Sequence, residues 1–205
     1  ENFMLEYCRD AKAFSEDIIT VVGGLHAQLC YERMYKDCVD YILTTFDIFK
    51  LLDIIKYAIF QEDIDVSKLE GICYKREGQW FNNKALPFEI KELPLPDRTY
   101  FYEHPSNYRY LALEHAAWVR TAYCCPYRCK FCHRNKMNAG KYVTRDIEDV
   151  VNEIESIQSD NIYIVDDDFL IDKERLSKFV QLIKEKKIKK NYICYGRADF
   201  IANNR

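Results

Sequence analysis

Glycine and proline are scarce in this chain, with 6 and 5 residues among 205. Such low counts argue against a low-complexity or linker-rich sequence. No apolar run reaches the roughly 18 residues that a membrane-spanning helix needs, and the longest helical candidate, residues 46–60, is interrupted by charged side chains. The net charge of −3 provides no basic excess of the kind that nucleic-acid-binding domains carry. What remains is an ordinary globular composition, 48% hydrophobic and 31% charged.

Cysteine, by contrast, is abundant, with 9 residues. In a reducing compartment most cysteines are free thiols or metal ligands. Five of them are scattered in apolar surroundings and are predicted to be buried small hydrophobic residues: Cys8, Cys30, Cys38, Cys73 and Cys194. We expect a cytoplasmic protein.

The other cysteines are clustered, and three of them form a C-x₃-C-x₂-C pattern: Cys125, Cys129 and Cys132. Iron–sulfur clusters are usually held by four cysteines. Three thiolates on one short loop can bind three irons of a four-iron cluster, which leaves the fourth iron without a protein ligand. An open iron suits a cluster that binds and reduces a small molecule, so the pattern predicts chemistry rather than simple electron transfer.

A zinc site is the alternative for this loop. Cys124 and His133 flank the three cysteines, and together the five side chains offer the thiolate and imidazole ligands that zinc prefers. Zinc loops usually add a second cysteine pair or more distant histidines, and no second C-x₂-C follows here. Unligated or disulfide-bonded cysteines are the third interpretation. Cys124 lies out of register with the pattern, and both it and His133 are left without an assigned role.

The sequence around the cysteines alternates predicted strands and helices. Residues 116–123 form an apolar segment typical of a buried strand, and the cysteine loop follows directly. A helix with Thr144 as its N-cap, a strand over 161–165, a helix capped by Asp172 and a strand over 191–195 are predicted next. This order indicates parallel βαβ units.

In such units the ligand site lies at the carboxyl ends of the strands. The cysteine loop, the acidic run Asp166-Asp167-Asp168 and Arg197 all fall at that end. Alternation along the chain allows Asp166 and Asp168 to face the same way. A solvated acidic turn is the other interpretation of the aspartates, and a surface salt bridge is the other interpretation of Arg197.

Residues 116–205 resemble the first half of a radical S-adenosylmethionine (SAM) enzyme, on the three cysteines, the aromatic Phe131 and the spacing of the βα units. The resemblance implies a partial (β/α) barrel, a [4Fe-4S] cluster on the three cysteines and SAM at the open iron. Reductive cleavage of SAM would start radical chemistry on a substrate, and no catalytic residue beyond the cluster ligands is assigned.

The resemblance also assigns cofactor-binding residues. Phe131 lies where relatives place an aromatic side chain near the adenine of SAM; a core anchor is its other interpretation. Asp166 and Asp168 replace the Gly-Gly-Glu run with which many relatives hold an ammonium group. Arg197 is suited to pair with a carboxylate.

The N-terminal part resembles the cobalamin-binding subclass of the same superfamily. A predicted strand over 17–22 runs into Gly23-Gly24-Leu25-His26-Ala27, where glycine permits close approach of a ligand; a plain tight turn is the other interpretation. The amphipathic helix 46–60, a short strand pair (71–75 with 80–83) and a linker (93–98, LPLPDR) follow. The resemblance implies that Gly23 and Gly24 line a cobalamin pocket in a Rossmann-like domain.

Two departures accompany this resemblance. An Asp-x-His-x-x-Gly ligand loop is missing, and Thr44-Thr45-Phe46-Asp47 stands where many relatives have Gly-Glu-Gly-Glu. The chain looks truncated at both ends relative to the family. We therefore expect the isolated fragment to hold cobalamin weakly and to be inactive alone.

Taken together, the sequence predicts an α/β protein: a partial Rossmann-like lobe (1–65), a linker lobe with short strands (66–115) and three βα units of a radical SAM barrel (116–205). The predicted function is reductive cleavage of SAM, with cobalamin-dependent methyl transfer as one reaction of the subclass. A zinc-stabilised module without catalysis and an inactive cluster-binding remnant are the alternatives. The expected partners are a small-molecule or peptide substrate and an electron donor such as flavodoxin or ferredoxin. No membrane is expected, and the sequence gives no evidence for nucleic acid.

Overall fold

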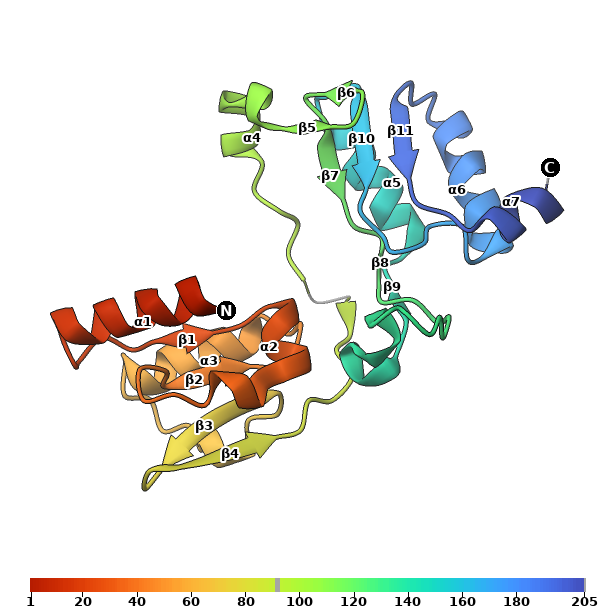
Figure 1. The fold of residues 1–205 in the computed structure, drawn as a ribbon. Coiled ribbons are helices and arrows are strands. Elements are labelled where there is room, and N and C mark those ends of the chain that lie inside the picture. The colour runs from red at the N-terminus through yellow and green to blue at the C-terminus, as the bar shows by residue number, and fades with distance from the viewer. Residues whose placement is uncertain (91–92, 205) are drawn as a thin grey trace. The chain divides into compact units, whose positions relative to one another are not determined.

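A computed structural model of the chain describes residues 1–90 and 93–204. Contacts divide it into two compact units, shown as ribbons in Figure 1. The N-terminal unit contains Glu1–Phe88 together with Lys136–Lys141, and the C-terminal unit contains Glu89–Asn135 together with Tyr142–Arg205.

The N-terminal unit is built on a sheet with the strand order β1-β2-β3-β4. β1 and β2 are parallel, and β3 and β4 extend the sheet as an antiparallel hairpin. The elements of this unit are α1 (Asn2–Phe14), β1 (Val21–Val22), α2 (Leu25–Cys30), η1 (Tyr31–Met34), β2 (Tyr41–Leu43), α3 (Phe49–Ala58), η2 (Val66–Lys68), β3 (Ile72–Arg76), β4 (Gln79–Asn83) and η6 (Asn138–Gly140).

Both faces of this sheet are covered because side chains alternate along each strand. On one face Ile42 packs with Leu5 and Cys8 of α1 in one core cluster. On the other face Ile72 packs with Ile54 of α3 in a second cluster. The sheet therefore lies between helices, as in a Rossmann-like fold.

The C-terminal unit is built on a parallel sheet with the order β11-β10-β7. Each parallel neighbour is reached through a helix, as βαβ connectivity requires. The elements are α4 (Thr99–Glu103), η4 (Pro105–Asn107), β5 (Arg109–Tyr110), β6 (Leu113–Glu114), β7 (Ala117–Val119), β8 (Ala122–Tyr123), η5 (Arg134–Lys136), β9 (Val143–Thr144), α5 (Ile147–Ser156), β10 (Asn161–Ile164), α6 (Lys173–Glu185), β11 (Asn191–Cys194) and α7 (Ala198–Asn203).

Helices α5 and α6 cover one face of this sheet (Figure 1). The buried core joins Val119, Ile162 and Ile164 of the strands to Val150 and Ile154 of α5. The opposite face is aromatic: the ring of Tyr163 in β10 is stacked by that of Tyr110 at 3.8 Å between centroids. The predicted α/β class, with parallel βα units after a Rossmann-like lobe, is confirmed.

Several local predictions differ from the structure. The strand predicted over 116–123 is divided into β7 and β8, and the strand predicted over 17–22 pairs only at Val21–Val22. Thr144 is not the N-cap of α5: it lies in β9, and the side chain of Asp146 caps the helix by accepting from the Glu148 N–H. Asp172 caps α6 as predicted.

The hairpin β3–β4 joins the first sheet, whereas a separate linker lobe was expected to begin at residue 66. The contacts divide the chain into two units after Phe88. The domain boundaries at residues 65 and 115 stay a prediction. The amphipathic pattern of residues 46–60 predicted a buried face formed by Ile48, Leu51, Leu52, Ile55 and Ile59. In α3 the buried residue is instead Ile54, and four of those five side chains, all but Ile55, are exposed, so the predicted buried face is wrong.

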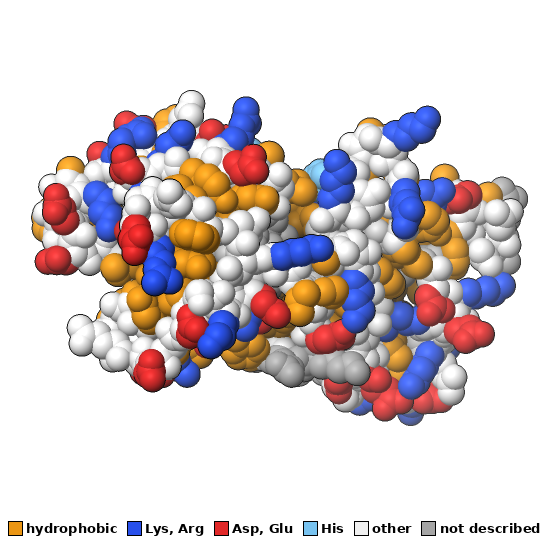
Figure 2. All heavy atoms as spheres, turned by 90° about the horizontal axis from the view of Figure 1, so that it is seen from below, with side chains coloured by type: hydrophobic (Ala, Val, Ile, Leu, Met, Phe, Trp, Pro, Cys, Tyr) orange, Lys and Arg blue, Asp and Glu red, His pale blue; other side chains and the backbone are white. Residues whose placement is uncertain are grey.

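Surface charge is mixed. Basic and acidic side chains are interspersed over the face shown in Figure 2, in keeping with the small net charge of −3. Among the described helices, none has the length and apolar character needed to span a membrane.

Candidate functional site

The cysteine loop begins directly after β8 and ends at β9, which forms a separate two-stranded sheet with β8. β8 and β9 pair antiparallel, with Ala122 opposite Thr144 and Tyr123 opposite Val143. This pairing clasps the two ends of the loop together. Within the loop, the Cys132 N–H donates to the Cys129 carbonyl at 3.0 Å. The clasp holds the loop at the carboxyl end of β7, where ligands bind in parallel sheets.

The three motif cysteines are free and partly buried, whereas Cys124 is 5% exposed. Burial raises the pKa of Cys124 to about 11 and also raises the pKa of Cys125. Cys124 adopts a left-handed backbone conformation with φ of 65°, which is unusual for a residue with a side chain. Cys124 therefore turns the chain into the loop, a role its spacing did not reveal.

The donor set fits an iron–sulfur cluster. Three thiols lie on one loop, and none of them is in a disulfide. Among the residues that the structure describes, no group of three Cys, His, Asp or Glu side chains is close enough to hold a metal ion. Binding a cluster therefore requires the thiols to turn toward one another. His133, at the end of the motif, is exposed.

Arg197 lies beside this loop at the end of β11. Its Nη1 is 3.8 Å from the Cys129 Sγ, and its guanidinium lies over the Tyr127 ring at 4.0 Å from the centroid. Nε and Nη2 donate to the two carboxylate oxygens of Asp199 at 2.9 and 2.8 Å. The structure thus places Arg197 next to the cysteines and also pairs it with a neighbouring carboxylate.

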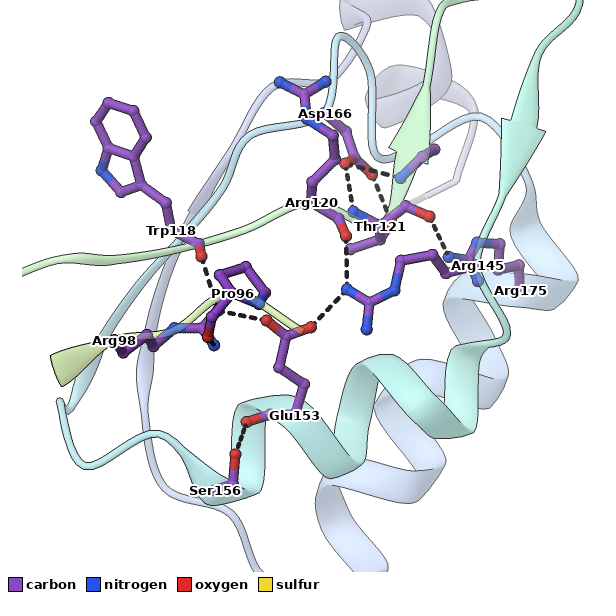
Figure 3. A network of polar contacts seen from close by, with 11 residues as sticks. Pro96, Arg98, Trp118, Arg120, Thr121, Arg145, Glu153, Ser156, Asp166 and Arg175 are labelled. Atoms are coloured by element: carbon purple, nitrogen blue, oxygen red, sulfur yellow. Dashed lines mark hydrogen bonds and ion pairs between the residues drawn. The ribbon is translucent and has the colours of Figure 1, made fainter. Parts of the chain in front are cut away.

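The three aspartates after β10 differ in their surroundings. Asp166 is 2% exposed; it accepts hydrogen bonds from the Thr121 N–H at 2.7 Å, the Ala122 N–H at 3.0 Å and the Thr121 hydroxyl. Both of its oxygens are therefore engaged in holding the chain between β7 and β8 (Figure 3). Asp167 forms an ion pair with Arg134, whose Nε lies 3.2 Å from the Asp167 Oδ1.

Asp167 and Asp168 each keep one carboxylate oxygen without a hydrogen-bond partner, and Asp167 already pairs with Arg134. Asp168 is 4% exposed, and its Oδ1 accepts from the Leu170 N–H at 3.0 Å. Its Oδ2 is buried without a hydrogen-bond partner, as is Oδ2 of Asp167. Burial raises the pKa of Asp168, and the nearby charge of Arg197 opposes that effect. Buried carboxylate oxygens without donors are costly, so this strand end is suited to a ligand that brings N–H groups.

The remaining predicted site residues lie in open surroundings. Phe131 is 93% exposed on the cysteine loop. In the N-terminal unit, Gly23 and Gly24 follow β1 at the carboxyl edge of its sheet. Gly24 has φ of 92°, and a Cβ there would meet no atom within 4 Å, whereas a Cβ on Gly23 would lie 3.3 Å from that of Leu43. The Gly-Gly turn therefore presents open backbone at that edge.

A buried ionic network behind β7 was not predicted from the sequence. Figure 3 shows Glu153 of α5 between Arg98 and Arg145. Arg98 belongs to the LPLPDR segment, which was noted for its resemblance but assigned no role. Arg98 and Glu153 are 55 residues apart, and no rule of sequence spacing pairs residues at that separation. The LPLPDR motif was therefore the only feature of the sequence that pointed to Arg98.

Residues 119–199 match the family model described as the Radical SAM superfamily. The match covers the parallel sheet and the cysteine loop, and it confirms the resemblance stated for that part of the chain. None of the curated proteins compared with the chain matches it.

Solved structures match across both units. The radical SAM methyltransferase TsrM from Kitasatospora setae, with tryptophan substrate and a SAM analogue bound, has a TM-score of 0.66 and 15% identity over 90% of this chain. A second TsrM structure, with cobalamin and a [4Fe-4S] cluster bound, has a TM-score of 0.63 and 14% identity over 90% of this chain. This chain spans 37% of the length of each. The fold of this chain is thus similar to that of part of TsrM.

Proposed function

We propose that this chain is the cluster-bearing part of a radical SAM enzyme in which Cys125, Cys129 and Cys132 bind a [4Fe-4S] cluster. The observation that carries the proposal is the position of three free thiols on one clasped loop at the carboxyl end of a parallel sheet. When bound, such a cluster supplies the electron that cleaves the sulfonium of SAM and starts radical chemistry. A flavodoxin or ferredoxin is the proposed source of that electron.

The chain's own residues would bind and orient SAM. We assign its ammonium group to Asp168, because Oδ2 of Asp168 is buried and lacks a donor, while both oxygens of Asp166 already accept hydrogen bonds. Asp166 then acts through Thr121 by fixing the chain that leads into the loop. Arg197 would offer the methionyl carboxylate its Nη1, which lies at the cysteine loop. Phe131, exposed on the loop, would cover the adenine.

Anaerobic reconstitution tests the proposal. In a protein that contains the complete barrel, we expect about four irons and four sulfides per chain, an electron paramagnetic resonance signal on reduction and release of 5′-deoxyadenosine from SAM. Stoichiometric zinc without a cluster signal would instead support the zinc-stabilised module. A cluster that never cleaves SAM, in a protein containing the complete barrel, would indicate a remnant.

We further propose that the reaction is a cobalamin-dependent methyl transfer. The support is the likeness of the fold to TsrM and the open Gly23-Gly24 turn at the edge of the N-terminal sheet. A ligand lying across that edge would approach the Gly24 backbone, and a side chain there would intrude on it.

Cobalamin binding can be measured by absorbance titration. Gly24→Val is expected to weaken binding at least about tenfold, the equivalent of roughly 1.4 kcal/mol. Gly78→Val is the matched control, because Gly78 also has a positive φ and open surroundings but lies in the β3–β4 hairpin turn. Equal affinities for the two variants would contradict the proposed pocket.

A further inference from the structure

A carboxylate in the middle of α5 is buried among apolar side chains. Glu153 is 2% exposed, and it follows the buried Val150 and Val151 on the face that packs against the sheet. Burying a carboxylate is costly unless it is paired and hydrogen-bonded. Glu153 is paired twice: Oε1 accepts from Arg98 and Oε2 accepts from Arg145.

Both arginines also hold backbone carbonyls of the chain that leads to the cysteine loop. Arg98 Nη2 donates to the Trp118 carbonyl at 3.1 Å, and Arg145 Nη1 donates to the Arg120 carbonyl at 2.9 Å. Glu153 lies between the two guanidinium groups in Figure 3. One carboxylate therefore orients both donors.

The Trp118 carbonyl belongs to β7, and the Arg120 carbonyl lies where the strand is interrupted. β7 ends at Val119 and β8 begins at Ala122, so the segment between them lacks a continuous ladder of strand hydrogen bonds. A third arginine, Arg175 of α6, donates to the Thr121 carbonyl at 3.2 Å. Arginine side chains thus donate here to carbonyls that a neighbouring strand would bind in a continuous sheet. The first motif cysteine, Cys125, lies four residues beyond Thr121.

We infer that Glu153 is a positioning residue for the cysteine loop, acting through Arg98 and Arg145. This inference rests on the proposed function for its purpose but not for its geometry. Without the Glu153 carboxylate, the buried guanidinium groups of Arg98 and Arg145 repel each other. They then move away and no longer donate to the carbonyls of residues 118 and 120. The backbone of residues 118–124 is then no longer held in one conformation. The positions of the three thiols relative to one another are then no longer fixed.

Hydrogen–deuterium exchange of the metal-free protein tests this directly. Glu153→Gln keeps the size of the side chain and removes its charge. We expect amides of residues 119–132 to exchange roughly tenfold faster, as for one lost hydrogen bond to a charged group, while amides of β10 and α6 keep their rates. Glu155→Gln is the matched control, since Glu155 lies on the same helix but pairs with Lys186 at the surface.

A second variant separates positioning from stability. Replacing a buried ionic triad with apolar side chains is often neutral or stabilising, so Arg98→Met/Glu153→Leu/Arg145→Met should unfold at a temperature near that of the wild type. It cannot donate to the carbonyls, so its loop should still exchange fast and, after reconstitution, its cluster should show a shifted reduction potential and lower iron content.

Two outcomes would overturn the inference. One is equal acceleration throughout α5, β10 and the loop in Glu153→Gln, and the other is wild-type loop exchange in the triple variant. Either would leave Glu153 with a purely structural role. A wild-type protein that binds no cluster would instead contradict the proposed function, while the exchange measurement on metal-free protein would stand.

Discussion

Replacing Cys129 with serine is expected to remove the iron–sulfur cluster, lowering the iron content from about four per chain to fewer than about one. In the proposed cluster each motif cysteine would supply one iron ligand, and no other cysteine lies at a position that completes the pattern. The hydroxyl of serine is a poorer donor to iron than a thiolate. Cys125→Ser and Cys132→Ser should behave in the same way, and SAM cleavage should be lost with the cluster.

Cys124→Ser is the matched control for this experiment. Cys124 adjoins the motif but is buried and turns the chain with φ of 65°, so serine there preserves the size of the side chain and the backbone. We expect full iron content in this variant. Loss of iron in Cys124→Ser with retention in Cys129→Ser would contradict the proposed ligand set.

The largest loss of stability from a single truncation is expected at Asp166. Asp166→Ala leaves three buried donors of Thr121 and Ala122 without an acceptor, and each unsatisfied donor costs about 1–3 kcal/mol. We expect the free energy of unfolding to fall by about 3 kcal/mol or more, measured by urea denaturation. Asp166→Asn keeps the acceptor for both N–H groups and should lose far less.

The same pair of variants gives a pH dependence. Burial raises the pKa of Asp166 above its ordinary value of 3.8, and its hydrogen bonds only partly oppose that effect. The folded state therefore holds this proton more tightly than the unfolded state, so the contribution of Asp166 falls as pH rises from about 3.8 to the raised pKa. Asp166→Asn should gain stability relative to the wild type over that window, and a constant difference would contradict the raised pKa.

Much of the C-terminal unit was predictable from its sequence. β10 and β11 are continuous apolar strands, and α6 begins with an aspartate cap, so each signal is local and unopposed. The strand 116–123 was predicted as one piece because most of its residues are apolar, although Arg120 and Thr121 interrupt them. Its division at Arg120 and Thr121 arises from Asp166 and three arginines, whose contacts depend on the fold rather than on neighbouring residues.

The features of the candidate site likewise fall into those that could be predicted from the sequence and those that could not. The three cysteines were predicted to be cluster ligands from their spacing on one short loop, and their role as ligands stays a prediction. The different surroundings of Asp166 and Asp168 were not predictable, since they depend on which backbone donors the end of β7 presents. Glu153 was missed because a single acid in an amphipathic helix carries no mark of burial, and its partner Arg98 lies 55 residues away.

The clasp formed by β8 and β9 has a consequence for how the metal centre is assembled. Closing a free loop of about 20 residues costs roughly 2.7 kcal/mol in chain entropy, and here that cost is met when the protein folds rather than when iron arrives. A carrier that delivers an intact cluster would therefore encounter thiols that are already tethered near one another. The rate of cluster transfer should then be set by ligand exchange on the carrier. A conformational search by the cysteine loop should add little to the transfer time.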